Sequence, residues 1–263
     1  MRKRVVSRTA QIYYLQARQL ETVGLYDYEF TKYDQRPLRR DMAHILIAAL
    51  TSIVDEEHVM QQNTERAMQL CVKNLFESTS AGAQHDALGF RIAHAHLLRK
   101  KEMIKAADEC LDGVHRDIYM YGCSERTYLS FLLEAGRNLL TRKNGPRAYC
   151  IYFVPCLERA MARSLTREAQ QARGYALQAL RQIGQLYDGA PENPDAVSIY
   201  IEAKISEGTF IETDMRPTVV DGVSQDPLAS YDINDDFERV FSLIRSPDAV
   251  AAEIKQLDNL KLE

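Results

Sequence analysis

The sequence has no tryptophan and few helix-breaking residues, with 8 prolines and 12 glycines among 263 residues. Ala, Leu, Gln, Glu and Arg recur along it instead, and these residues favour helices over strands. With 46% hydrophobic residues, the chain can bury a sizeable core. We therefore expect a globular protein of the all-α class.

Long apolar runs and paired cysteines are also missing. The longest apolar stretch, residues 148–157, contains Pro155 and is shorter than the roughly 18 apolar residues that predict a membrane span. The basic beginning lacks the apolar core of a secretory signal, although the absence of acids before Glu21 leaves a mitochondrial presequence open. Five cysteines without a CxxC pair predict neither a disulfide framework nor a thiolate zinc site. We expect a cytoplasmic protein without membrane contact.

The net charge of −4 conceals an uneven distribution along the chain. Residues 1–40 carry nine Lys/Arg and four Asp/Glu, residues 41–187 carry 18 and 16, and residues 188–263 carry six and 17. Their net charges are +5, +2 and −11, and residues 137–181 alone hold nine Lys/Arg against two Glu. Such asymmetry indicates a charged partner, another subunit, or a contact with the protein's own basic face.

The N-terminal part of the sequence has apolar residues at helical spacing. They predict helices over about residues 9–30, 42–54 and 64–77, and Asp41 is placed to cap the second of these. Polar connectors separate them, and a Ser/Gly-rich loop follows the third. We expect residues 1–87 to form N-terminal helices that cap or extend the part that follows.

After residue 87 one arrangement of residue types recurs three times, counted from the anchors Ala106, Ala148 and Ala196. A large apolar residue lies sixteen positions before each anchor, at Phe90, Leu132 and Leu180. Twelve positions before each anchor lie His94, Gly136 and Gly184. The pattern predicts pairs of helices in which the small residues allow a close approach and the large ones pack against the next pair.

This arrangement resembles the tetratricopeptide repeat, a family of stacked helix pairs. The clearest copy is LRQIGQLY with PDAVSIYIEA, at residues 180–203, and looser copies begin at Phe90 and Leu132. The resemblance covers about residues 88–208, with anchors 42 and 48 residues apart where the family repeats every 34 or so. It implies helix-turn-helix pairs stacked into a short α-solenoid; a non-repetitive helical bundle is the alternative.

The last part of the chain, residues 209–263, is rich in Asp, Pro and Gly before a final amphipathic stretch. Such a composition is typical of an extended segment rather than of a packed domain. Ser246 and Pro247 are placed to start a helix near the end. We expect an acidic, extended arm that ends in a short helix.

The resemblance also indicates where a partner would bind. In peptide-binding members of the family, the positions fifteen and eleven residues before the anchors line the concave face. In this chain those positions include Arg91, Arg137, Arg181 and Gln185. The concave face is therefore expected to be basic and to suit a protein partner with an acidic segment. The chain's own acidic arm is one candidate, through self-association.

A second basic row recurs every four residues, at Arg159, Arg163 and Arg167. This spacing predicts that the three side chains share one face of a long helix, where they could contact an acidic surface or phosphates. Aromatic residues for base stacking are not interleaved with them, so nucleic acid is the less favoured partner.

An enzyme is the alternative from a different class. His58, His85, Asp86 and His115 form a dispersed set similar to that of HD-domain phosphohydrolases, in which a divalent metal activates water. Surface and helix-cap histidines explain the same residues, and the sequence has no HExxH, GxxxxGK[ST], GxGxxG or GxSxG motif. We expect a non-enzymatic interaction or assembly scaffold without cofactor or metal. A structural part of a large assembly, such as a phage particle or a secretion machine, stays open.

Overall fold

The structure, a computed structural model, describes residues 18–33, 40–53, 57–185, 246–260 and 262. Every secondary-structure element in these ranges is a helix, which confirms the all-α class. The chain divides into two compact units, Met1–Cys123 (unit 1) and Ser124–Glu263 (unit 2). The division falls between the first and the second of the three repeated segments in the sequence.

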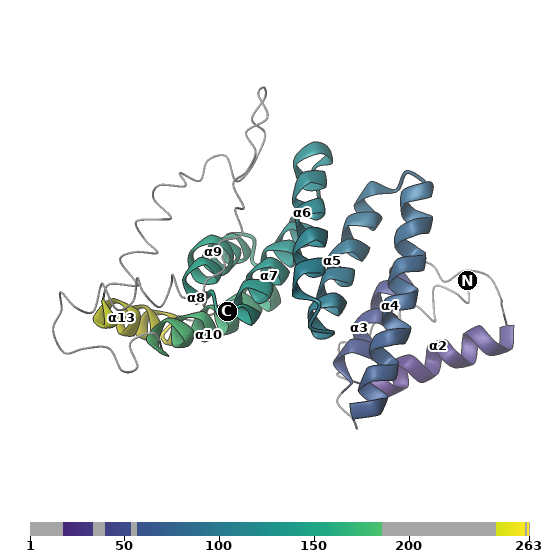
Figure 1. Ribbon diagram of the computed structural model, residues 1–263, viewed down its shortest axis with the longest axis horizontal. Coiled ribbons are helices and arrows are strands. Elements are labelled where there is room, and N and C mark those ends of the chain that lie inside the picture. The colour runs from purple at the N-terminus through teal and green to yellow at the C-terminus, as the bar shows by residue number, and fades with distance from the viewer. Residues whose placement is uncertain (1–17, 34–39, 54–56, 186–245, 261, 263) are drawn as a thin grey trace. The chain divides into compact units, whose positions relative to one another are not determined.

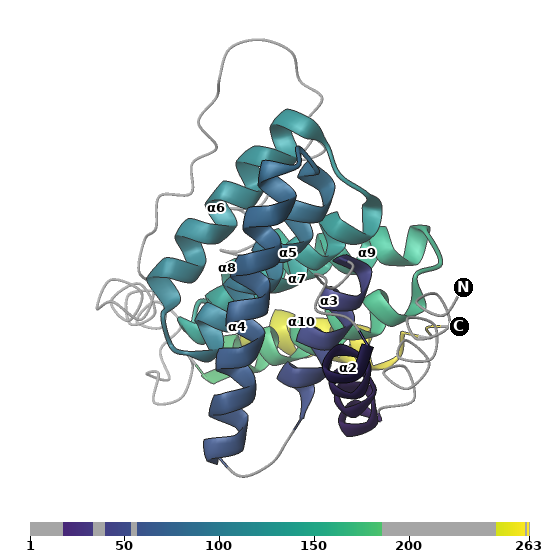
Figure 2. The ribbon, with the colours of Figure 1, turned by 90° about the vertical axis from the view of Figure 1, so that its right-hand side faces the viewer.

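The described part of unit 1 is a series of helices that pack in chain order, as Figures 1 and 2 show. They are α2 (Gln19–Tyr33), α3 (Arg40–Ser52), α4 (Glu57–Ser80), α5 (Gln84–Lys100) and α6 (Ile104–Tyr121). Large side chains from α2, α3 and α5 fill one core, among them Tyr26, Leu46, Leu50 and Phe90. α4 adds the buried Ala67 and Cys71 to this core, and its Met68, Leu70 and Leu75, which are partly buried, pack against it.

Two helix starts in unit 1 differ from the sequence expectations. Asp41, expected just before the second predicted helix, lies inside α3, which begins at Arg40. α4 begins at Glu57, not near residue 64; the start was missed because the exposed Met60, Gln61 and Gln62 do not form an apolar face at helical spacing. Ala87 and Leu88, on either side of the boundary expected from the sequence, both lie within α5, which packs on both α4 and α6.

The described helices of unit 2 pack around α10. They are α7 (Glu125–Thr141), α8 (Gly145–Arg147), the π-helix η1 (Ala148–Phe153), α9 (Val154–Ala162), α10 (Thr166–Gln185) and α13 (Pro247–Asp258). α10 contacts all the others, and Figure 1 shows α13 alongside it. Ser246 caps α13 by accepting a hydrogen bond from the backbone N–H of Ala249, as expected from the sequence.

One turn geometry recurs at four helix junctions. The middle residue of each turn has a positive φ, between 54° and 68°, at Gly82, Glu102, Lys143 and Ser164. This residue donates its N–H to the carbonyl three positions back, and the next residue donates to the carbonyl five positions back. The pattern is the Schellman type of helix end. These four helix-turn-helix connections, two in each unit, are therefore built alike.

Two features of unit 2 bear on the predicted helix pairs. Gly136 of α7 faces the ring of Phe153, where a Cβ would lie only 2.5 Å from a ring carbon, so the expected close approach at this glycine is confirmed. Pro155 lies in the first turn of α9, directly after η1. A π-helical turn changes the hydrogen-bond register, which accommodates a residue that has no N–H to donate. The second helix of the third repeat, with Ala196, and the expected arm at 209–245 lie outside the described residues.

Candidate partner-binding surface

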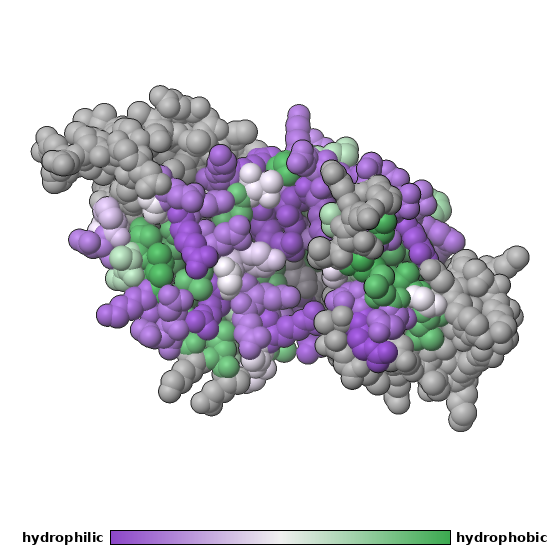
Figure 3. Space-filling model, turned by 90° about the horizontal axis from the view of Figure 1, so that it is seen from below, coloured by the Kyte–Doolittle hydropathy of each residue, from purple (hydrophilic) through white to green (hydrophobic). Residues whose placement is uncertain are grey.

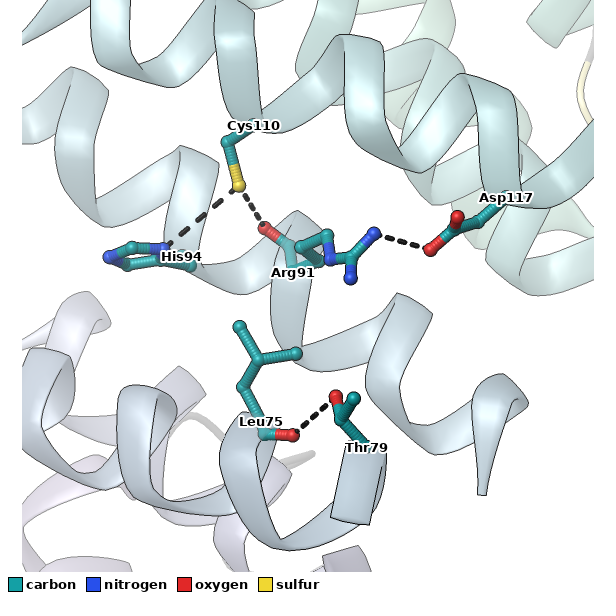
Figure 4. Close-up of polar contacts among 6 residues, drawn as sticks. All are labelled: Leu75, Thr79, Arg91, His94, Cys110 and Asp117. Atoms are coloured by element: carbon teal, nitrogen blue, oxygen red, sulfur yellow. Dashed lines mark hydrogen bonds and ion pairs between the residues drawn. The ribbon is translucent and has the colours of Figure 1, made fainter. Parts of the chain in front are cut away.

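Arg91, the one predicted site residue in unit 1, is held between two helices (Figure 4). Its guanidinium, on α5, forms an ion pair with Asp117 on α6, and both side chains are about three-quarters buried. The Sγ of Cys110 donates a hydrogen bond of 3.3 Å to the carbonyl oxygen of Arg91. Arg91 therefore joins α5 to α6 by its side chain and by its backbone.

The same cluster places a thiol next to an imidazole, since Cys110 Sγ lies 4.0 Å from His94 Nδ1 (Figure 4). Burial raises the pKa of Cys110 to about 11 and lowers the pKa of His94 below its ordinary value of 6.5. Both groups are therefore neutral at pH 7. A nucleophilic cysteine needs a lowered pKa and a cationic neighbour, so this pair lacks the properties of a catalytic dyad.

In unit 2, Arg137 and Arg159 each combine an ion pair with a ring contact. Arg137 donates to Glu134 at 3.0 Å on the same helix, α7, and its guanidinium lies 5.1 Å from the centre of the Tyr175 ring on α10. Arg159 on α9 donates to Glu125 on α7 at 3.2 Å through Nη2, and this contact lowers the pKa of Glu125. These two arginines thus connect helices inside unit 2.

Arg159 also lies over the ring of Tyr128, at 4.8 Å from its centre. The expected row of Arg159, Arg163 and Arg167 on one long helix is wrong. α9 ends at Ala162, Arg163 is its C-cap, and Ser164 turns the chain with a φ of 54° before α10 begins. A spacing of four residues puts side chains on one face only while the helix is unbroken.

Arg167, Arg181 and Gln185 do share a face, on α10. The exposed residues of this helix are Arg167, Gln170, Gln171, Gly174, Gln178, Arg181 and Gln185. At 100° per residue they fall within an arc of about 100°, and they extend over about 27 Å. The opposite side is buried and consists of Ala169, Ala172, Ala176, Ala179, Leu180 and Ile183. We call the seven exposed residues the α10 face.

The α10 face has only basic and uncharged polar side chains, apart from one glycine. Its members are two arginines, four glutamines and one glycine, so it contains neither an acidic nor an apolar side chain. Gln185 was expected from the repeat register, but Gln170, Gln171 and Gln178 were missed because that register considers only two positions in each first helix. Their recurrence at intervals of three and four residues, together with the arginines, is the signal that would have found them.

The residues of the enzyme alternative are not gathered around a metal-binding position. His85 is exposed and Asp86 half-buried at the start of α5, while His115 lies half-buried on α6. The side chain of His58 lies outside those described. Among the described residues no three His, Cys, Asp or Glu side chains come together as a metal site would require.

On the face drawn in Figure 3, the described residues are mainly hydrophilic, with separate hydrophobic patches among them. Val72 and Phe76, one turn apart on α4, are exposed apolar side chains of unit 1. No helix in the described ranges has the length and the apolar character that crossing a membrane demands. Comparisons with protein families, with curated proteins and with solved structures found no match to this chain.

Proposed function

We propose that this protein is a non-enzymatic, protein-binding scaffold, and that its α10 face holds an acidic segment of the partner. The observation that carries the proposal is the composition of that face, where seven exposed positions over five turns contain no acid. Arg167 and Arg181 supply positive charge near its two ends, and the glutamines between them can donate and accept hydrogen bonds. An extended acidic peptide matches both properties.

Gly174 contributes to this proposal through its position. It lies at the middle of the α10 face and has no atoms near its would-be Cβ, so a peptide backbone can approach the helix there. A nucleic acid is less suited to the face, since single-strand binding relies on aromatic side chains for stacking and the α10 face has none. Part of the proposal is that this helix belongs to a tetratricopeptide-like stack, which the repeated pattern of the sequence suggests.

The test is binding of a fluorescent twenty-residue polyglutamate peptide to the full chain, measured by anisotropy. The variant Arg167→Glu/Arg181→Glu reverses both charges of the α10 face. An exposed ion pair contributes about 0.2–1 kcal/mol, and repulsion adds a similar amount, so the double reversal should weaken binding by roughly tenfold. Added salt should weaken the wild-type complex.

The matched control is Lys105→Glu/Arg116→Glu, which makes the same charge change at exposed positions of α6. It should bind the peptide as the wild type does. The proposal is refuted if the wild type does not bind polyglutamate or if the α10 variant binds it equally well. Tighter binding of an oligo(dT) strand of equal length would replace it with a nucleic-acid function.

A further inference from the structure

The helix α13 carries its own start and stop signals. Ser246 caps its N-terminus, Pro247 occupies the first turn together with Asp248, and Lys255 lies in the last turn. Each of these residues favours a helix without help from the rest of the chain. Residues 186–246 separate it from the end of α10, the helix on which it packs.

α13 docks through a pattern that is typical of helices bound as ligands. Val250 and Leu257 are buried, at 3% and 6% exposure, and Glu253 and Ile254 between them are half-buried. These four residues have the i, i+3, i+4, i+7 spacing with which an amphipathic helix binds a hydrophobic surface. The other side of α13 is exposed, at Ala251, Ala252, Lys255, Gln256 and Asp258.

Two polar contacts fix the direction of α13. The hydroxyl of Tyr149, a residue of η1 with only 1% exposure, donates a hydrogen bond of 2.6 Å to Glu253 Oε2. Arg173 Nη2 on α10 donates to the carbonyl oxygen of Asp258 at 2.9 Å. A cation at the C-terminal end of a helix complements the helix dipole, so a helix docked in the reverse direction would lose this contact. We call α10 with Tyr149 and Arg173 the α13-binding surface.

We propose that α13 is an exchangeable docking helix, and that the α13-binding surface of one copy accepts the α13 of a second copy. None of the contacts above depends on covalent continuity between α13 and α10. At about 3.3 Å per extended residue, the chain between them is long enough to reach a neighbouring copy. This proposal is separate from the function proposed for the α10 face. It concerns assembly of the protein by exchange of an identical helix between copies.

Opposite charges also favour the binding of α13 to a second copy. Residues 188–263, which include α13, carry a net charge of −11, whereas residues 137–181, which include most of the α13-binding surface, hold nine Lys/Arg against two Glu. Opposite charge speeds the encounter of two copies and fixes their relative register. A tethered helix has an effective concentration on the order of millimolar, so the chain's own α13 competes in dilute solution. The test must therefore disable each copy's own pairing.

Two full-length variants do this in complementary ways. Val250→Asp/Leu257→Asp disables α13 and leaves the α13-binding surface open. Tyr149→Phe/Arg173→Glu disables the surface and leaves α13 intact. Each variant alone should have the mass of one chain, 30.0 kDa. An equimolar mixture should form a 1:1 heterodimer of twice that mass, detected by native mass spectrometry with one variant isotopically labelled.

The matched control is Ala251→Asp/Gln256→Asp, which adds the same two charges to the exposed side of α13. Its own α13 still docks, so it should form no heterodimer with the surface variant. Val250→Ala/Leu257→Ala replaces the Asp variant if circular dichroism shows that the latter does not fold. Folded complementary variants that do not form the heterodimer overturn the proposal. Reversal of Arg167 and Arg181 should leave the heterodimer intact, which separates this proposal from the function of the α10 face.

Discussion

The substitution Gly136→Ala tests a close contact between α7 and η1 in unit 2. In most helices this change stabilises by about 0.5–1 kcal/mol, because glycine loses more conformational freedom on folding than alanine. Here the new Cβ would lie 2.5 and 2.7 Å from two ring carbons of Phe153. That ring is fully buried and stacks on Tyr175 with centroids 5.6 Å apart, so it cannot move without disturbing a second aromatic side chain.

Overpacking of this kind costs about 1–3 kcal/mol, which exceeds the gain in helix propensity. We expect Gly136→Ala to lower the free energy of unfolding by about 1–2 kcal/mol and the Tm by several degrees, at about 2–4 °C per kcal/mol. The assay is thermal and urea unfolding followed by circular dichroism at 222 nm or so, with both variants in the same buffer.

Gly174→Ala is the matched control, since it is the same change in a helix with nothing within 4 Å of the would-be Cβ. It should raise stability by about 0.5–1 kcal/mol, so that the two substitutions have opposite signs. In the double variant Gly136→Ala/Phe153→Leu the clash is removed, and the two single effects should not add. If Gly136→Ala stabilises the protein as much as Gly174→Ala does, the close contact with Phe153 is not present in solution.

Three further predictions concern ionisable groups. Arg159 lowers the pKa of Glu125 below its ordinary 4.5, so the free energy of unfolding should fall as the pH drops through the folded pKa of Glu125. In urea unfolding between about pH 5 and 3, Arg159→Ala should make this fall smaller. An unchanged dependence on pH would contradict the pairing. Burial raises the pKa values of Cys71 and Cys110 to about 12 and about 11, so the free energy of unfolding should decline as the pH rises above 9, where the unfolded thiols ionise. Alanine at both positions should make the decline smaller. An equal decline would count against the burial of the two thiols. Burial lowers the pKa of His94, so the free energy of unfolding should fall as the pH drops below 6.5, and His94→Gln should remove part of that fall. The same pH dependence in both proteins would refute this prediction.

Local sequence determined the helical class and several helix ends. Ser246 with Pro247 predicted the start of α13 correctly, because a helix cap depends on side chains within a few residues. Gly136 was recognised as a point of close approach because a small residue recurred at one register of the repeated pattern. The start of α4 was missed because the exposed Met60, Gln61 and Gln62 do not form an apolar face at helical spacing.

The role of each arginine, by contrast, was decided by tertiary structure. Sequence spacing treated Arg91 and Arg159 as partner-binding residues, yet their carboxylate partners, Asp117 and Glu125, come from neighbouring helices 26 and 34 residues away. The turn at Ser164 likewise separated a row of arginines that a continuous helix would have kept together. Residue spacing fixes which side chains share a face of one helix, but only helix packing decides which of those faces is covered and which, like the α10 face, stays exposed.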